Sequence, residues 1–409
     1  MAKVLIEKIP EYHPKALRAF LEKTFALIQP GRSIKSGHKV LIKPNFLRAK
    51  SVGAAVTPHP ILIAETCKLV IDLGATPVIG DSPAMGAAQA VAAKIGLDEF
   101  IKSSDAPIIN LSHPREVVLK NPIKYRKLEL SSQAFEFDRI INLAKLKTHD
   151  LLLMTMAVKN LFGCVVGKRK PAYHLEAGHK PELFAELLLE IYKCLSPSVS
   201  IIDAIIAMEG NGPGNGDPKK IGLLMASEDA VALDRVAGET VNMPFDYNLT
   251  AKLGTKHGVG EGDLKKIEVL GPSLDQVKVF DFKAIHPGPP GGQRGVGFGR
   301  WLLGESASWK PVFNHQLCTR CSACIEICPS KALSYEQERG ALSRFLGSGL
   351  SDDDARAGMM RPDPYKDSKY KKRVAINREL CIRCFCCQEV CPEGAIRSEK
   401  GWLARFLAP

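Results

Sequence analysis

The sequence predicts two domains of different class: a large, mainly parallel α/β domain at the N-terminus and a small, cysteine-rich domain at the C-terminus. Three observations lead to this prediction. The chain has 409 residues, more than one hydrophobic core usually serves. Strand-like and helix-like segments alternate through residues 39–271. Nine of the twelve cysteines fall in the last hundred residues, at the spacing of metal ligands.

The first unit of the α/β pattern lies at residues 39–80. KVLIK (39–43) predicts a strand, TPHPILIAETCKLVIDLG (57–74) a helix and TPVIG (76–80) a second strand. Prolines stand at the start of the helical segment and Gly74 at its end, as is typical of helix boundaries. The order indicates a βαβ unit.

The alternation continues along the chain and predicts a doubly wound sheet, in which ligands bind outside the carboxyl ends of the strands. Residues that directly follow a strand are therefore the candidates for a site. The further segments are the strands RIINLA (139–144), VSIIDA (199–204), IGLLMA (221–226) and KIEVLG (266–271), and the helices 181–195 and 228–241.

Polar side chains follow four of these strands and can converge on one pocket, where lysines would bind an anion. No motif identifies a catalytic residue, so the candidates for proton transfer rest on position alone. They are Lys145, Lys147, His149 and Glu209, although Glu209 is equally well a plain loop carboxylate. The expected anion site consists of Lys43, Asn45, Lys145, Lys147, Lys159 and Asn160.

Several basic or glycine-rich segments do not match the motif that they suggest. GCVVGKR (163–169) has three residues between its glycines and lacks Ser or Thr after the lysine, so it is not a phosphate loop. GNGPGNG (210–216) lacks the dinucleotide fingerprint and is expected to join two strands. The run 168–170 is interpreted as a solvated loop. His174 and His179 are five residues apart and do not form a zinc-binding pair.

The cysteine-rich region contains an internal repeat. FNHQLCTRCSACIEICPSKAL (313–333) matches INRELCIRCFCCQEVCPEGAI (376–396) at an offset of 63, and each copy has the pattern C-x2-C-x2-C-x3-C-P. Three cysteines spaced in this way can wrap a loop around one face of a metal cluster. Cys386 aligns with Ala323 and is therefore a surplus thiol; ligand exchange or redox sensing is the alternative role.

The repeated pattern resembles the bacterial two-cluster ferredoxins, which implies a small α+β domain that binds two [4Fe-4S] clusters. In that family the last cysteine of each run ligates the other cluster. A structural zinc site would explain neither the third cysteine of each run nor the proline that follows. The resemblance implies one cluster on Cys318, Cys321, Cys324 and Cys391, and a second on Cys381, Cys384, Cys387 and Cys328.

The N-terminal region resembles the domain of unknown function 362 family, some of whose members carry a C-terminal ferredoxin module. The resemblance rests on LIKPN, GDSP, KLKTH with TMAVKNLFG, MEGNGPGNG and VALDRVA. The family has no established reaction, so the resemblance implies a domain and no catalytic residue. The expected organisation is an α/β domain at 1–285, a Gly/Pro-rich linker at 286–309 and a ferredoxin-type domain at 310–400.

An insertion at about 335–373 separates the two halves of the ferredoxin-type domain and is either a solvated loop or a docking surface for a redox partner. The N-terminus lacks a signal-peptide pattern and no apolar run is long enough to span a membrane, so a cytoplasmic protein is expected. The formal charge of +12 is spread along the chain without a nucleic-acid-binding motif, and nucleic acid is not an expected partner.

The favoured function is an iron–sulfur oxidoreductase that passes electrons between a soluble donor protein and a small anionic substrate or cofactor in the α/β domain. The alternative is a non-enzymatic electron carrier, or a redox-sensing module, whose large domain docks a partner protein. Whether the chain is an enzyme stays open at this point because fold does not determine chemistry. No flavin motif is present.

Overall fold

The computed structural model describes residues 1–28, 34–284, 309–337 and 372–400. Within these residues the N-terminal domain contains a nine-stranded sheet in the order β11-β1-β10-β9-β7-β2-β3-β4, with β8 paired to β7. The strands are β1 (Ala2–Lys8), β2 (Lys39–Pro44), β3 (Thr76–Asp81), β4 (Ile108–Asn110), β7 (Arg139–His149), β8 (Leu153–Thr155), β9 (Val199–Glu209), β10 (Asp217–Ser227) and β11 (Ile267–Leu270). A separate hairpin consists of β5 (Pro114–Val118) and β6 (Lys127–Ser131).

The sheet is mainly parallel, as the sequence predicts. β9, β7, β2, β3 and β4 all run in one direction, and β11 is parallel to β1. β10 is antiparallel to both of its neighbours, β1 and β9. Its pairing with β9 is antiparallel because the GNGPGNG segment is a hairpin that places Asp217 opposite Glu209. The expectation that this segment joins two strands is confirmed.

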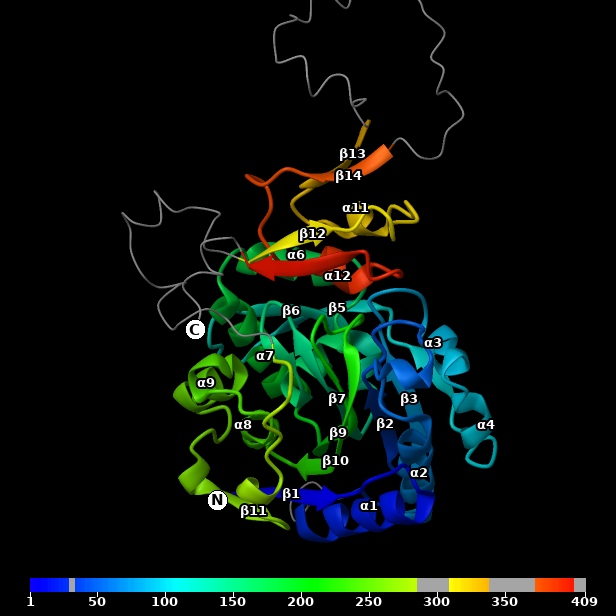
Figure 1. Ribbon diagram of the computed structural model, residues 1–409. Coiled ribbons are helices and arrows are strands. Elements are labelled where there is room, and N and C mark those ends of the chain that lie inside the picture. The colour runs from blue at the N-terminus through cyan, green and yellow to red at the C-terminus, as the bar shows by residue number, and fades with distance from the viewer. Residues whose placement is uncertain (29–33, 285–308, 338–371, 401–409) are drawn as a thin grey trace, which may run out of the picture.

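Helices cover both faces of the sheet and enclose two hydrophobic cores. In β2, Leu41 faces one core while Val40 and Ile42 face the other, as the two-residue period of a strand requires. Figure 1 shows α2, α3 and α4 on the right of the strands and α7, α8 and α9 on the left. The helices are α1 (Pro14–Ile28), α2 (Pro60–Asp72), α3 (Ala88–Lys94), α4 (Leu97–Ile101), α5 (Ala157–Asn160), α6 (Arg169–Ala177), α7 (Pro181–Leu195), α8 (Ala230–Thr240) and α9 (Leu249–Lys256).

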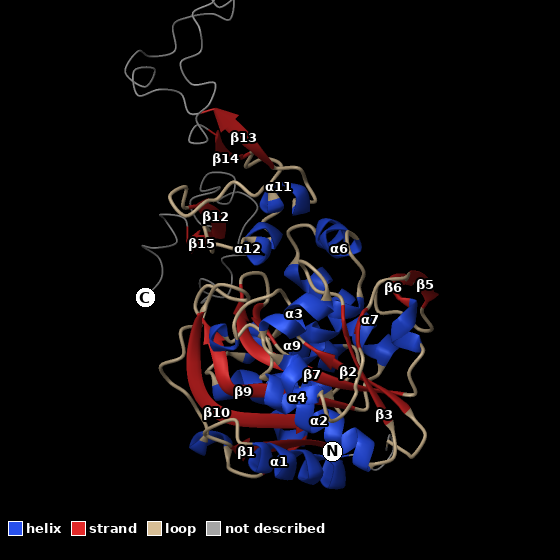
Figure 2. Ribbon diagram, turned by 90° about the vertical axis from the view of Figure 1, so that its right-hand side faces the viewer, coloured by secondary structure: helices blue, strands red, loops and turns tan. Residues whose placement is uncertain are grey.

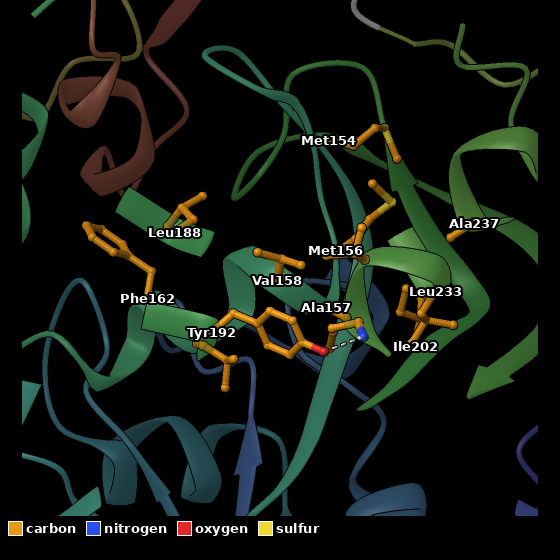
Figure 3. Close-up of a cluster of buried hydrophobic side chains, with 14 of the residues drawn as sticks. Met154, Met156, Ala157, Val158, Phe162, Leu188, Tyr192, Ile202, Leu233 and Ala237 are labelled. Atoms are coloured by element: carbon orange, nitrogen blue, oxygen red, sulfur yellow. Dashed lines mark hydrogen bonds between the residues drawn. The ribbon is translucent and has the colours of Figure 1, made fainter. Parts of the chain in front are cut away.

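The larger core holds the chain that follows β8 against α7 and α8. Val158 and Phe162 pack with Leu188 of α7 and Leu233 of α8 in a continuous buried cluster (Figure 3). Buried contacts of this kind fix the backbone of the short helix α5, which could not be stable alone. The polar residues at the end of α5 are thereby held at the carboxyl end of the sheet.

The C-terminal domain repeats one unit of strand, helix and strand. β12 (Trp309–Phe313), α11 (Ala323–Ile327) and β13 (Leu333–Gln337) return, shifted by 63 residues, as β14 (Lys372–Ile376), α12 (Cys386–Val390) and β15 (Ile396–Lys400). The two halves exchange strands, since β12 pairs with β15 and β13 with β14. The expected small α+β domain is confirmed, and Figures 1 and 2 show it above the carboxyl end of the large sheet with α12 facing the larger domain.

Two features expected from the sequence fall largely outside the described residues. These are the linker at 286–309, of which 286–308 are not described, and the insertion at about 335–373, of which 338–371 are not described. The proposed domain boundaries therefore stay predictions. In the described part of the chain, no helix combines the length and the apolar character needed to cross a membrane.

Candidate functional site

Four cysteines from both halves of the repeat line one small pocket in the C-terminal domain: Cys318, Cys321, Cys324 and Cys391. The first three lie before or within α11, and the fourth directly follows α12. Burial raises the pKa of the Cys324 thiol to about 11, and repulsion from the other three thiols adds to the shift. The exchange of strands between the two halves thus brings these four sulfurs together.

The other four repeat cysteines form a second group. Burial raises the pKa of the Cys381 thiol, and Cys384 and Cys328 raise it further by charge repulsion. Burial also raises the pKa of Cys387 well above its ordinary value, and charge repulsion from Cys384, Cys381, Cys328 and Cys324 of the first group adds to the shift. Cys328, which follows α11 in the first half of the repeat, therefore lies with three cysteines of the second half.

Both groups suit iron–sulfur clusters in donor type and surroundings. Each contains four thiols, which are the ligands that cubane clusters use. Backbone N–H groups donate to the last sulfur of each run, from Ala332 to Cys328 Sγ at 3.2 Å and from Ala395 to Cys391 Sγ at 3.3 Å. Across the described ranges, no three Cys, His, Asp or Glu side chains surround a single metal ion. A cubane does not need such convergence, because each thiolate binds a different iron.

Cys386 is the surplus thiol predicted to belong to neither group. Its side chain is buried and hydrogen-bonded to Cys384, a contact that raises the pKa of Cys386 well above the ordinary thiol value. It also lines a cavity that separates α12 from the larger domain. Cys386 thus lies between Cys384, a predicted cluster ligand, and the cavity. That Cys386 itself does not bind a cluster stays a prediction.

Three of the predicted lysines on β2 and β7 are buried and do not line that cavity. Lys43 Nζ lies 2.8 Å from Asp81, and Lys145 Nζ lies 2.9 Å from Asp203, so both are neutralised within the α/β domain. Lys147 donates instead to neutral acceptors, Asn45 Oδ1 at 2.5 Å and Val56 O at 2.8 Å. Burial lowers the pKa of Lys147 well below its ordinary value, and the positive charge of Lys159 contributes.

Asp234, the buried aspartate of the VALDRVA segment, caps the N-terminus of α5, the short helix that carries Lys159 and Asn160. Asp234 accepts hydrogen bonds from the N–H groups of Ala157 at 2.7 Å and Val158 at 3.3 Å, at the first turn of α5. These N–H groups have no partner within the helix and require an acceptor. Asp234 therefore positions the end of α5 at the cavity, a role that explains why an acidic residue is buried there.

The cavity has a volume of about 80 Å³ and lies between the two domains at the carboxyl end of the sheet. This volume is sufficient for several waters or a small molecule. Of the predicted anion-site residues, Asn45, Lys159 and Asn160 line it. The other polar walls are Asp81, Ser82, Thr155, Lys170 and His174 from the α/β domain, and Cys386 and Glu389 from α12.

Glu389 of the C-terminal domain places a carboxylate next to His149 and near Lys159, at the carboxyl end of the large sheet. Its Oε1 lies 2.7 Å from Nε2 of His149, whose Nδ1 accepts the N–H groups of Leu151 and Leu152. Nε2 must therefore carry the proton and donate to Glu389. Burial lowers the pKa of His149 to about 4, with Lys159 adding to the effect, so the imidazole is neutral at pH 7.

Glu389 itself is ionised. Burial alone would raise the pKa of this carboxyl, but Lys159 and the hydrogen bond from His149 hold it well below its usual range. Burial lowers the pKa of Lys159 below its ordinary value, and the negative charge of Glu389 opposes part of that shift. The carboxylate of one domain and the ammonium of the other thus stabilise each other across the interface.

Two further basic groups face the cavity, and the sequence did not identify either of them. Lys170 donates to the carbonyl oxygen of Ser82 at 2.5 Å, and burial lowers its pKa to about 8, so the interpretation of this lysine as part of a solvated loop is wrong. His174 stacks on Phe184, and burial lowers its pKa to about 3. No described residue accepts from or donates to Nδ1 of His174.

The structure separates Glu209 from the other candidates. This carboxylate at the end of β9 accepts the N–H of Lys283 at 2.9 Å and lies 3.7 Å from the ammonium of the same residue. It does not line the cavity. His149 is nearer to the site, but both of its ring nitrogens are occupied, so its role there is to hold Glu389.

Comparison with known proteins identifies both domains. A family model described as "Domain of unknown function (DUF362)" matches residues 40–239, and one described as "4Fe-4S dicluster domain" matches residues 310–392. The chain is 41% identical over 228 residues to the "Thylakoid-associated protein sll1697" of Synechocystis, an alignment that covers 56% of this chain and 70% of that protein.

Two oxidoreductases are similar over shorter stretches. "Probable pyruvate-flavodoxin oxidoreductase" of Escherichia coli is 31% identical over 104 residues, 25% of this chain and 8% of that protein. One component of the "H(2):CoB-CoM heterodisulfide,ferredoxin reductase" of Methanothermobacter marburgensis is 28% identical over 92 residues, 22% of this chain and 12% of that protein. Among solved structures, the lactate racemase apoprotein from Thermoanaerobacterium thermosaccharolyticum matches with a TM-score of 0.36 and 11% identity, covering 56% of this chain and 54% of that one. The dicluster match gives the C-terminal domain an iron–sulfur electron-transfer role.

Proposed function

Because the chain belongs to the domain of unknown function 362 family and carries a 4Fe-4S dicluster domain, we propose that it is an iron–sulfur oxidoreductase whose small anionic substrate binds in the cavity between its two domains. Electrons pass between this substrate and a soluble donor protein. The cavity replaces the site first expected around Lys43 and Lys145, because those two lysines are neutralised by Asp81 and Asp203.

One observation carries the proposal: the cavity is walled by both domains, and its C-terminal wall consists of α12, which holds a proposed cluster ligand, together with Ile327 at the end of α11. Cys386 and Glu389 of α12 face Lys159, Lys170 and His174 of the α/β domain. Cys387, adjacent to Cys386, belongs to the second group of thiols. A molecule in the cavity therefore lies beside a redox centre and beside groups that can bind charge.

The cavity residues have separate roles in this proposal. Glu389 favours the charged form of Lys159, but, unlike Lys43 and Lys145, Lys159 makes no direct ion pair among the described residues and can therefore attract the anion. Lys170 is the group best suited to proton transfer, because burial lowers its pKa to about 8, close to neutral pH. His174 is neutral and offers an unpartnered ring nitrogen, Nδ1.

The cofactor is a pair of [4Fe-4S] clusters, which when bound supply single electrons. We assign Cys318, Cys321, Cys324 and Cys391 to one cluster and Cys381, Cys384, Cys387 and Cys328 to the other, supported by the two groups of thiols described above. The numerous thiols at metal-ligand spacing suit a reducing compartment, and we place the protein in the cytoplasm on that ground. Thylakoid association is the property named for one relative.

The test is native mass spectrometry of anaerobically purified full-length protein. We expect the mass of two four-iron clusters together with a small bound molecule that is lost in a Lys159→Met/Lys170→Met variant. Lys168→Met is the matched control, because this lysine is exposed in the same segment. The iron and sulfide mass, measured in the same spectrum, verifies that each variant retains its clusters.

The same experiment separates the enzyme from the electron carrier. The released molecule, added back to the reduced wild-type protein, is expected to reoxidise the clusters, followed by their visible absorbance. A bound molecule that survives in the double variant, or no bound molecule with electron transfer only to another protein, would contradict the substrate cavity and favour a carrier whose large domain docks a partner.

A further inference from the structure

Arg48 is a buried arginine of the α/β domain that reaches into the cysteine-rich domain. It lies four residues beyond the end of β2 and is only 4% exposed. Its Nη1 donates to the carbonyl oxygen of Cys391, and its Nη2 donates to the carbonyl oxygen of Gly214 at 2.5 Å and to Oδ1 of Asn215. The guanidinium group thus joins the β9–β10 hairpin to a cysteine of the first thiol pocket.

The charge of Arg48 is not matched by any of these partners. All three acceptors are neutral oxygens, and Nε has no hydrogen-bond partner in the described part of the chain. A guanidinium group does not give up its proton in a protein, and an unpaired charge is costly to bury. Burial lowers the pKa of Arg48 from its ordinary value, whereas Cys391, Glu389 and Glu393 oppose that shift. An additional negative charge close to Cys391 would therefore balance the buried guanidinium group of Arg48 and stabilise it there.

That negative charge is available from the group that Cys391 would help to hold. Cys391 shares its pocket with Cys318, Cys321 and Cys324, and a cubane on four thiolates carries about two negative charges when oxidised and three when reduced. The backbone carbonyl of Cys391 is fixed by Arg48 and also accepts from Asn215 Nδ2 at 3.3 Å. A cation from one domain is thereby held beside a ligand of the other.

The hairpin is shaped to accept this arginine. A Cβ on Gly214 would lie 3.0 to 3.1 Å from the guanidinium atoms of Arg48, closer than ordinary side-chain contacts. Lys50 adds a second link by donating to the carbonyl oxygen of Pro392 at 2.8 Å. The glycine-rich segment that matches no nucleotide-binding motif is therefore the docking surface for the end of α12.

We propose that Arg48 is the counter-ion of the cluster held by Cys318, Cys321, Cys324 and Cys391, and that it couples the redox state of this cluster to the docking of the two domains. Arg48 stabilises the additional negative charge of the reduced state and so raises the reduction potential. Because linkage is reciprocal, reduction tightens the docking by the same factor. The inference rests on the ligand assignment proposed above and is independent of the substrate cavity.

The repeat provides an internal comparison. The position equivalent to Cys391 is Cys328, whose sulfur lies 3.2 Å from the N–H of Ala332 and 3.7 Å from Oγ of Ser330. The sulfur of Cys391 has the corresponding N–H contact from Ala395, at 3.3 Å, and the backbone carbonyl of Cys391 in addition accepts a hydrogen bond from Arg48. The arginine is therefore expected to make the two clusters unequal in potential.

The test is a potentiometric titration of the full-length, cluster-loaded protein, monitored by electron paramagnetic resonance. Arg48→Met should lower the equilibrium constant for one-electron reduction of one cluster at least tenfold, which is ~59 mV, and that of the other by less. Arg48→Lys retains a charge and should keep most of the wild-type potential. Lys50→Met, which removes a charge from the carbonyl of the adjacent residue, is the matched control and should have a smaller effect.

Docking is measured in parallel by amide hydrogen exchange of residues 211–216, which should be slower in the dithionite-reduced protein than in the oxidised protein. Loss of this difference in Arg48→Met would support the coupling. The proposal is overturned if Arg48→Met leaves both potentials unchanged or shifts both equally. It is also overturned if Arg48→Lys lowers the potential as much as Arg48→Met while the exchange rates remain at wild-type values, because the effect would then not depend on charge. Loss of the bound small molecule in the cavity would concern the proposed substrate and not this inference.

Discussion

Replacement of Glu389 by Gln removes a negative charge that the C-terminal domain places beside His149 and Lys159 of the α/β domain. The glutamine amide can still contact His149 Nε2, which lies 2.7 Å from Glu389 Oε1 in the native protein. It cannot balance the ammonium of Lys159, whose charged form Glu389 supports. The substitution therefore leaves the half-buried ammonium of Lys159 without its counter-charge and replaces a charge-assisted hydrogen bond to His149 by a neutral one, a change expected to cost ~1.4 kcal/mol.

A loss of this size corresponds to about tenfold weaker docking of the two domains. The assay is native-state amide hydrogen exchange of the cluster-loaded protein at α12 and at residues 211–216, where the domains meet. Glu326→Gln is the matched control, because Glu326 is the repeat equivalent of Glu389 on α11 and is exposed. Equal exchange in the two variants, or a Glu389→Gln protein that exchanges like wild type, would refute the argument that this carboxylate is the electrostatic anchor.

Two further predictions concern the clusters and the pH dependence. Cys386→Ala, which introduces the residue found at the equivalent position 323, should retain about eight irons per chain, as two four-iron clusters require. Cys387→Ala should instead lose one cluster. Iron analysis together with electron paramagnetic resonance distinguishes the two outcomes. For His149, the folded pKa of about 4 lies below the ordinary value of 6.5, so the unfolded chain binds more protons between these values. The native protein should lose up to ~3 kcal/mol as pH falls through this window, seen as a lower urea midpoint, and His149→Gln should flatten that dependence; an unchanged slope would contradict it.

The sequence was sufficient for the parts of the fold that local patterning determines. The βαβ unit at 39–80 corresponds to β2, α2 and β3, because apolar periodicity and helix-boundary residues agree there. β1 and α1 were not predicted, although both bury apolar side chains in the core. The 63-residue repeat predicted the architecture of the small domain, because each copy folds as the same strand, helix and strand. The grouping of Cys391 with the first run and of Cys328 with the second depends on contacts between the two copies.

The site was less predictable because its residues come together only through tertiary contacts. Lys43 and Lys145 looked like anion-binding groups at strand ends, and nothing local in the sequence indicates that Asp81 and Asp203 neutralise them. Glu389 meets His149 across 240 residues, and Arg48 meets Cys391 across 343. The repeat offered one signal in the sequence. Positions at which the two copies differ, such as Gln388 against Ile325, indicate where the second copy contacts a part of the protein that the first copy does not.

That comparison also explains why α12, and not α11, docks on the larger domain. Gln388 replaces Ile325 and donates to Asn211 Oδ1 at 2.7 Å and to the carbonyl oxygen of Gly212 at 3.0 Å. A Cβ on Gly212 would lie 2.3 Å from the carbonyl oxygen of Thr148, so the hairpin can present this carbonyl only with glycine at that position. The second copy thus has polar groups matched to the hairpin and to the basic end of β7. Docking through α12 brings Cys386 and Glu389 to the cavity. In the function proposed above, the surface that holds the domains together would therefore also determine where electrons reach a bound molecule.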